Sequence, residues 1–391
     1  MDMKSKGRIF FRASAVILTL AVLIAAVKLF HKQILGFAVD VMVLSAKSYL
    51  VTVRDTRESY ESLPETTSVQ QTVTEKTTEE DIPAVKVTEA TTEKTTEKKT
   101  DVYSISLSDE DVAAIMKSAE KKAEKDKKDG AISDYRYTKD GATDIYGSIR
   151  VKNTNKTKIN IESELKKKAD LKVSEDEPSV LIYHTHTTET YQLIDRDFYA
   201  QGNKTRSNKE DRNMIRVGKA IKEQLEKAGY KVIHVTDIHD NPYSGAYSRS
   251  RENISSYLKK YPSIDITLDI HRDAIQRSDG TKIAPTVEIN GRKAAQIMII
   301  SGCQEDGNGI TNLPDWKYNL TFALQLQQSL ESSFPGLTRP VFFCARSYNM
   351  NLTHNSLLVE VGSDANTLDE AVYSGKCLGV ALARLMKEYE K

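Results

Sequence analysis

The feature that most constrains the fold is a regular alternation of short apolar runs with amphipathic segments from residue 178 to the C-terminus. Apolar runs of strand length predict buried strands, and apolar residues at helical spacing predict the helices between them. This alternation is typical of a mostly parallel central sheet flanked by helices, so we expect an α/β fold. The expected strands are 179–186, 230–237, 264–274, two within 287–302, the extended segment 341–352 and 356–363, and the expected helices are 213–229, 248–261, 318–334 and 368–390.

An apolar run near the N-terminus predicts a membrane anchor. Residues 9–30 are almost uninterrupted in their apolar character, and about 20 helical residues cross the apolar part of a bilayer. The flank before the run is more basic than the flank after it, which places the N-terminus in the cytoplasm and the rest of the chain outside. We expect a cytoplasmic tail (1–8), one transmembrane helix (9–30) and a juxtamembrane segment (31–64). A cleaved signal peptide is the alternative, but no small-residue cleavage site closes the run.

A low-complexity segment follows. Residues 65–100 repeat Thr, Glu and Lys with hardly any large apolar side chain. They cannot bury enough apolar surface to offset their conformational entropy, so we expect a disordered stalk that holds the C-terminal part away from the membrane.

Residues 101–177 are expected to form an accessory region of helix and hairpin. Ser108 is a candidate N-cap for a helix that becomes charged all round and ends near Gly130. Alternating aromatic and aliphatic residues within 134–153 predict a short hairpin. The catalytic domain is then expected to occupy residues 178–391.

Charge and cysteine content exclude two classes of protein. The chain carries 56 Lys and Arg against 55 Asp and Glu, a net charge of +1. A dedicated nucleic-acid-binding protein would carry a pronounced basic excess. The three cysteines, Cys303, Cys344 and Cys377, are widely spaced and form no CxxC pair. They predict buried thiols rather than a disulfide scaffold or a thiolate zinc site.

Polar side chains at the ends of three expected strands are the candidate functional residues, because ligands of such sheets bind at the carboxyl ends of the strands. His184, His186 and Glu189 lie in HTHTTE, directly after an apolar strand. The two histidines are two residues apart, so in extended chain both would point to the same side. Imidazole and carboxylate groups suit Zn²⁺ where thiolates are lacking.

The second and third strand ends are DIHRDA and LLVEVGSDAN. His271 ends an apolar strand, and Asp269 or Asp273 is expected to orient its ring. Glu360 follows apolar residues in a strand that should be buried, where a carboxylate is costly without a partner. A glutamate there suits a general base that takes a proton from a metal-bound water. The alternative for Glu360 is a structural ion pair with one of two arginines, Arg346 or Arg384.

These motifs, in this order, resemble the stage II sporulation protein P family. The segments concerned are LIYHTHTTETY, NMIRVGKAIKEQLE, SGAYSRSRENI, IDITLDIHRDA and LLVEVGSDANTLDEA, from about residue 178 to the C-terminus. Family members are membrane-anchored cell-wall hydrolases of endospore-forming bacteria, similar to zinc-dependent N-acetylmuramoyl-L-alanine amidases of the amidase-3 fold. The resemblance implies cleavage of peptidoglycan at the amide between muramic acid and the L-Ala of the stem peptide. It also implies cleavage of peptide cross-links, a role in engulfment at the mother-cell membrane, and stage II sporulation proteins D and M as partners.

The resemblance also implies roles for single residues. Carried over by motif, His186 and His271 would be ligands of Zn²⁺ and Glu360 the catalytic base. A zinc-bound water has a pKa of about 7 instead of about 15.7, so hydroxide would be available at neutral pH to attack the amide.

The carboxylate ligand is where this sequence departs from the amidase pattern. Amidases of this fold usually supply it from the start of the first helix, where Glu210 and Asp211 stand here. Glu189 is nearer to the histidines, and we predict it as the ligand because no long loop must be ordered. His184 remains an alternative to His186 for the same reason.

Arg249, Arg251 and Arg272 are candidates for binding a substrate carboxylate as a fork, although a structural role is the simpler expectation. A different class of function stays open: a membrane-anchored scaffold that binds peptidoglycan without cleaving it, and therefore needs no metal. A serine or cysteine hydrolase has little support, because Ser301 and Cys303 lack a GxSxG motif.

Overall fold

The larger of two sheets carries the candidate residues. The structure is a computed structural model that describes residues 101–305 and 312–390. Its eight-stranded sheet has the order β2-β3-β11-β10-β12-β7-β4-β6. Only β2–β3 and β10–β12 pair antiparallel, so the expected mostly parallel sheet is confirmed. The strands are β2 (Asp144–Tyr146), β3 (Ile149–Asn153), β4 (Val180–Tyr183), β6 (Val232–His234), β7 (Ile266–Asp273), β10 (Ile297–Gly302), β11 (Val341–Cys344) and β12 (Asn355–Ser363).

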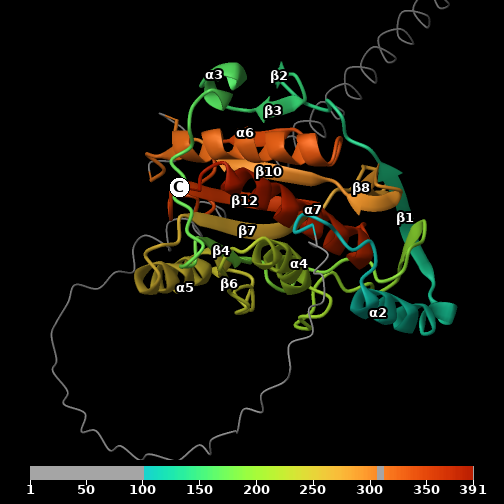
Figure 1. Ribbon diagram of the computed structural model, residues 1–391. Coiled ribbons are helices and arrows are strands. Elements are labelled where there is room, and N and C mark those ends of the chain that lie inside the picture. The colour runs from blue at the N-terminus through green and yellow to red at the C-terminus, as the bar shows by residue number, and fades with distance from the viewer. Residues whose placement is uncertain (1–100, 306–311, 391) are drawn as a thin grey trace, which may run out of the picture. The chain divides into compact units, whose positions relative to one another are not determined.

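Helices cover both faces of this sheet (Figure 1). Successive side chains of a strand point to opposite faces, so β4 separates two packing layers. Val180 and Ile182 pack into the main core, where three long helices supply most of the helical residues. Leu181 and Tyr183 pack on the other face with Ile254 of α5 (Ala246–Lys260). The three long helices are α4 (Met214–Lys227), α6 (Trp316–Ser333) and α7 (Leu368–Lys387), and α2 (Glu110–Glu120) and α3 (Ile161–Leu165) add Val112 and Ile161.

A smaller sheet, which the sequence did not predict as a unit, lies beside the first at the right of Figure 1. Its order is β5-β1-β8-β9, and only β1 and β8 pair parallel. The expected two strands within 287–302 are thus three, because β8 and β9 form a hairpin before β10 begins. The strands are β1 (Lys128–Tyr135), β5 (Phe198–Ala200), β8 (Lys282–Ile289) and β9 (Arg292–Ala295).

The segment 101–177 is hydrogen-bonded to both sheets, because β3 pairs with β11 and β1 pairs with β8. The predicted hairpin is confirmed by the antiparallel pair β2–β3. The prediction of Ser108 as N-cap is wrong by one residue, because the side chain of Asp109 accepts the hydrogen bond from Val112 N and caps α2 (Glu110–Glu120). The predicted end near Gly130 is also wrong: a 3-10 turn (Ala123–Lys125) follows α2, and Gly130 lies inside β1.

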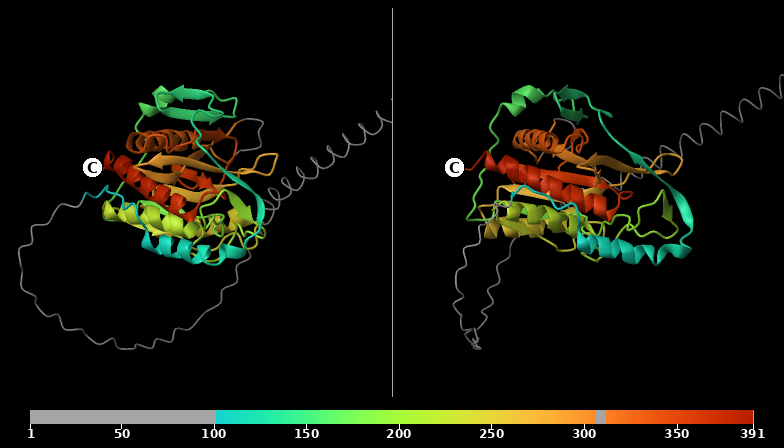
Figure 2. Two further views of the ribbon diagram at one scale, coloured as in Figure 1. Left: turned by 90° about the vertical axis from the view of Figure 1, so that its right-hand side faces the viewer. Right: turned by 45° about the vertical axis from the view of Figure 1, so that its right-hand side comes forward.

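α2 is fixed against the layer that holds α4 and α7, as Figure 2 shows. The Asp109 carboxylate pairs with Arg216 of α4 and with Lys376 of α7. Val112 of α2 is fully buried. The start of the described chain is therefore part of the same packed body as the strands that carry the candidate residues.

Four expected segments concern residues that the structure does not describe. The cytoplasmic tail (1–8), the transmembrane helix (9–30), the juxtamembrane segment (31–64) and the stalk (65–100) all lie outside the described residues. Among the described residues, no helix is both long and apolar enough to cross a bilayer. The three cysteines are free and buried, as expected.

Candidate active site

The strand faces bring two of the predicted residues side by side. Ile266, Leu268 and Ile270 of β7 belong to the main core, so Asp269 and His271 point to the opposite face, the one that α5 covers. The same alternation turns Glu360 of β12 to that face. Glu360 is in register with His271 across the parallel pair β12–β7. A buried imidazole and a carboxylate thus lie on adjacent strands at the carboxyl end of the sheet.

His186 completes this group from the turn that follows β4. Its ring lies against that of His271, with 5.3 Å between the ring centroids and an interplanar angle of 85°. Burial, followed by the charge of His271, lowers the pKa of His186 to about 4. The imidazole is therefore neutral at pH 7, which is the form that binds a metal.

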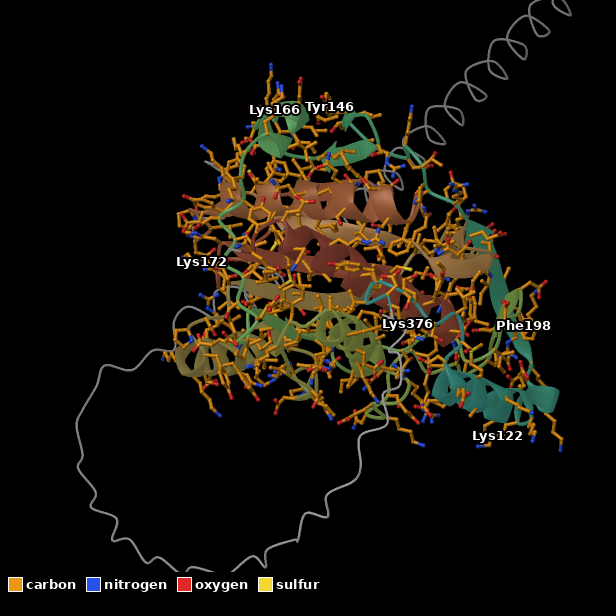
Figure 3. All side chains as sticks on the ribbon, in the orientation of Figure 1. Lys122, Tyr146, Lys166, Lys172, Phe198 and Lys376 are labelled. Atoms are coloured by element: carbon orange, nitrogen blue, oxygen red, sulfur yellow. The ribbon has the colours of Figure 1, made fainter. Side chains whose placement is uncertain are left out.

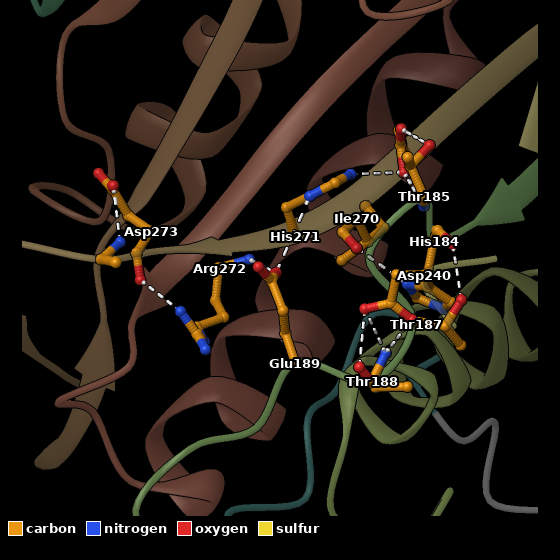
Figure 4. Close-up of polar contacts among 12 residues, drawn as sticks. His184, Thr185, Thr187, Thr188, Glu189, Asp240, Ile270, His271, Arg272 and Asp273 are labelled. Atoms are coloured by element: carbon orange, nitrogen blue, oxygen red, sulfur yellow. Dashed lines mark hydrogen bonds and ion pairs between the residues drawn. The ribbon is translucent and has the colours of Figure 1, made fainter. Parts of the chain in front are cut away.

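His271 is held between carboxylates (Figure 4). Its Nε2 lies 2.8 Å from Asp269 Oδ1, an ion pair in which the N–H is not aligned as a hydrogen bond. Its Nδ1 lies 3.9 Å from Glu189 Oε2. Burial by itself would lower the pKa of His271, but the charges of Asp269, Glu189 and Glu360 outweigh it and raise the pKa to about 9. Of the two aspartates expected to orient the ring, the structure places Asp269 there, whereas Asp273 pairs with Arg339.

Glu189 is buried beside His271, in the turn that HTHTTE forms. The backbone N–H of Arg272 donates to Glu189 Oε2 over 3.4 Å, and Arg206 Nη2 lies 3.5 Å from Glu189 Oε1. Burial raises the pKa of this carboxyl. By contrast Glu210 and Asp211, the alternative ligands, are exposed, and Asp211 pairs with Arg212.

The expectation that His184 and His186 point to the same side is wrong. β4 ends at Tyr183, so His184 still faces the α4 side. The turn that follows places the ring of His186 against His271, on the other face. His184 Nδ1 donates to the carbonyl of Ile270 over 2.9 Å, and His184 Nε2 accepts from His234 Nε2 over 2.9 Å. Both ring nitrogens of His184 are therefore engaged away from His271.

Glu360 has no counter-charge of the expected kind. Within the described part of the chain it forms no ion pair with Arg346 or Arg384, and its Oε2 is buried without a hydrogen-bond partner. Burial raises the pKa of Glu360 to about 8. A buried carboxylate without a partner is costly, so the site favours either a proton on Glu360 or a cation next to it.

The imidazole and carboxylate groups of the site are of the types that bind Zn²⁺, but they do not converge on one point. Among residues 101–305 and 312–390, no three His, Cys, Asp or Glu side chains converge closely enough to count as a metal site. However, His186 Nδ1 is buried without a hydrogen-bond partner, as is Glu360 Oε2. Two imidazoles and a carboxylate are a usual zinc donor set, and buried donor atoms without a hydrogen-bond partner are what an added cation would satisfy.

Two aromatic side chains that the sequence did not single out enclose His186. The ring of Tyr243 stacks on it at 4.6 Å and 8°, and Tyr247 meets it edge-on at 5.6 Å. On the outer side, the guanidinium of Arg206 lies 4.9 Å from the Tyr243 ring and pairs with the buried Asp240. Tyr243, Arg206 and Asp240 come from loops, where no periodicity in the sequence marks them, whereas Tyr247 lies in the first turn of α5. Only Tyr247 falls inside a motif, AYSRSRE.

The arginines proposed for substrate binding are used by the fold instead. Arg272 donates to the carbonyls of Thr190 and Thr205, over 3.0 and 2.9 Å. Arg249 donates to the carbonyl of His239, and Arg251 to Asn351 Oδ1. The structural role is therefore the one observed for each.

Comparison with known proteins gives one family. The family model described as Stage II sporulation protein P (SpoIIP) matches residues 28–383. A curated relative, the stage II sporulation protein P of Bacillus subtilis (strain 168), is 25% identical over 228 residues, which are 55% of this chain and 53% of the relative. The match thus spans about half of that relative's length.

Solved structures with a similar course of the chain are also found. N-acetylmuramoyl-L-alanine amidase AmiC2 of Nostoc punctiforme is 13% identical, with a TM-score of 0.32, over 56% of this chain and 98% of that one. The CwlD amidase of Clostridioides difficile, in complex with the GerS lipoprotein, is 11% identical, with a TM-score of 0.35, over 54% and 99%.

Proposed function

The chain belongs to the stage II sporulation protein P family, and from that premise we propose that it is a zinc-dependent peptidoglycan hydrolase. The bond cleaved is the amide between N-acetylmuramic acid and the L-Ala of the stem peptide. One observation carries this proposal: Glu360 and His271 lie in register on adjacent parallel strands, with the His186 ring 5.3 Å from that of His271. A general base beside two imidazoles is the constellation that metal-assisted amide hydrolysis needs.

His186, His271 and Glu189 would hold the zinc ion. When bound, Zn²⁺ supplies a Lewis acid and a water of lowered pKa. Two features of the chain support this donor set. His186 is neutral at pH 7, since its pKa is lowered to about 4, and its Nδ1 has no other partner. Asp269 holds His271 from its Nε2 side, which leaves Nδ1 toward Glu189.

Glu360 is proposed as the general base. Its Oε2 accepts the proton of the attacking water and then donates it to the amine that leaves with L-Ala. The pKa of about 8 that burial gives Glu360 suits a group that must both take and return a proton near neutral pH. A cation beside it would lower this pKa. Tyr243 and Tyr247 cover His186 and exclude bulk water from that side.

We propose the same biological setting as for the family. The chain would be a single-pass membrane protein with its catalytic domain outside the cytoplasm, acting on peptidoglycan during engulfment in sporulation. Stage II sporulation proteins D and M would be its partners, and cleavage of peptide cross-links a second activity. Residues 9–30 are the apolar segment that would anchor it.

The test is release of stem peptides from purified sacculi by the full-length chain, analysed as muropeptides with added Zn²⁺ and with a chelator. We expect release with zinc and none with chelator. Glu360→Gln should lower the rate by roughly 10²- to 10⁴-fold while retaining bound zinc. Glu288→Gln, an exposed glutamate of β8, is the matched control and should behave as wild type. Equal release by Glu360→Gln would remove Glu360 from the mechanism. A chain that binds sacculi but releases nothing would be a scaffold.

A further inference from the structure

A cleft separate from the proposed zinc ligands lies between α2 and the segment 190–212. It has a volume of about 800 Å³, which is within the range of sites that bind peptides and small molecules. α2 contributes its C-terminal half, from Ala114 onward, and the facing wall is the chain that follows the HTHTTE turn. Asp109 fixes α2 to α4 and α7, so this wall is preformed.

The cleft adjoins the proposed zinc ligand Glu189. Thr190 and Arg206 line it. Thr190 is the residue after Glu189, and Arg206 lies 3.5 Å from the Glu189 carboxylate. The cleft and the proposed zinc site therefore meet at Arg206.

The cleft carries a surplus of positive charge. Its lining includes six basic residues and one acidic residue, Asp126. The three arginines are neutralised within the protein, by Asp126, Asp240 and Asp211. No ion pair is formed by the three lysines with any side chain in the described part of the chain. The lysines are Lys122, Lys204 and Lys209.

Apolar side chains line the cleft together with these charged groups. Ala114, Ala119 and Ile115 face the cleft from α2, and Leu193 and Ile194 from the opposite wall. A ligand that fits has several carboxylates together with small apolar groups. Methyl side chains and free carboxylates on an extended chain are the chemistry of a peptidoglycan stem peptide.

We propose that this cleft binds the stem peptide on the C-terminal side of L-Ala, and that Lys122, Lys204 and Lys209 recognise its carboxylates. This inference rests on the proposed function, because it assigns the cleft to the substrate of that site. Exposed charge pairs are each worth up to about 1 kcal/mol, so each lysine should contribute roughly a two- to fivefold effect. The lysines would act on binding of the substrate and not on the chemical step.

The experiment measures binding and cleavage separately with the full-length chain. Binding is measured by calorimetry with a stem tetrapeptide whose carboxylates are free and with one whose carboxylates are amidated. Cleavage is measured with the corresponding soluble N-acetylmuramoyl peptides. The variants are Lys122→Gln, Lys204→Gln, Lys209→Gln and all three together. Lys172→Gln is the matched control, because Lys172 is exposed and lies on the opposite side of the molecule from Lys122 (Figure 3).

We expect each substitution to raise Kd and KM for the free-acid peptide roughly two- to fivefold with kcat unchanged, and to leave the amidated peptide unaffected. Unchanged Kd for the free-acid peptide in the triple variant would overturn the assignment, even if cleavage proceeds. Tighter binding of poly(glycerol phosphate) than of the peptide would overturn it too, in favour of a phosphate polymer. If the peptide binds in this pattern but is never cleaved, the cleft stands and the proposed hydrolase function falls.

Discussion

Replacing Asp269 by Asn tests the charge arrangement around His271 in the metal-free protein. The Asp269 carboxylate is buried and lies 2.8 Å from His271 Nε2. It also accepts hydrogen bonds from the backbone N–H and the hydroxyl of Thr185, over 2.8 and 2.6 Å. Asparagine keeps the shape but not the negative charge, so the imidazolium loses the neighbour that holds its proton. Breaking a buried pair in this way costs about 3–5 kcal/mol.

The size and the pH dependence of the effect follow from the pKa of His271. It is about 9 in the folded protein against an ordinary value of 6.5, a difference that corresponds to about 3 kcal/mol of folding free energy. Because the folded pKa is the higher one, this stabilisation is fully present below pH 6.5 and is lost as the pH rises through about 9. The free energies of unfolding of wild type and Asp269→Asn should therefore differ most near the lower pH and become similar at the higher pH.

The assay is urea unfolding of the full-length chain with chelator present, followed by the fluorescence of the single tryptophan, Trp316, across this pH range. Thr185→Val is the matched control. It removes a hydrogen bond to the same carboxylate but no charge, so its difference from wild type should not depend on pH. If the loss of unfolding free energy in Asp269→Asn were also independent of pH, the reasoning would be refuted.

Three further changes test other parts of the site. Glu189→Ala should abolish zinc binding, whereas Asp211→Ala should leave the zinc content of the purified chain unchanged; the reverse result would move the carboxylate ligand to the helix start. Tyr243→Ala should weaken zinc binding by roughly two- to tenfold in a chelator competition, because a stacked aromatic pair is worth about 0.5–1.5 kcal/mol, and unchanged affinity would exclude a positioning role. Gly218→Ala should lower the free energy of unfolding by about 1–3 kcal/mol, since a Cβ there would lie 2.5 Å from His234 Nε2 and 2.7 Å from His184 Nε2. A urea midpoint of Gly218→Ala equal to that of wild type would show that α4 shifts to make room for the added methyl group.

The alternating part of the fold was predictable because periodicity records which face of an element is buried. The helix expected at 213–229 is α4 (Met214–Lys227), and the strand expected at 356–363 is β12 (Asn355–Ser363). The same reasoning failed for the side of His184, because a strand pattern does not show that β4 ends at Tyr183 and that a turn follows. The face of the sheet to which a side chain points could be predicted only where the strand continued, as it does through His271.

Contacts between loops could not be predicted from the sequence, for a different reason. Tyr243 reaches His186, and Arg206 reaches Asp240, across separations that no repeat or motif encodes. The capping error at Ser108 is smaller: two adjacent residues, Ser108 and Asp109, are both good N-caps, and the ion pairs of Asp109 with α4 and α7 decide between them.

The pairing of β3 with β11 has a consequence for any shortened form of this protein. A fragment that began at residue 178 would lose β3 and leave the outer rim of Val341–Cys344 with bare amide and carbonyl groups. Such a rim is a template on which other polypeptides can add as extra strands, and it promotes aggregation. The segment before residue 178 therefore covers this rim and helps to keep the part of the chain that follows it from aggregating.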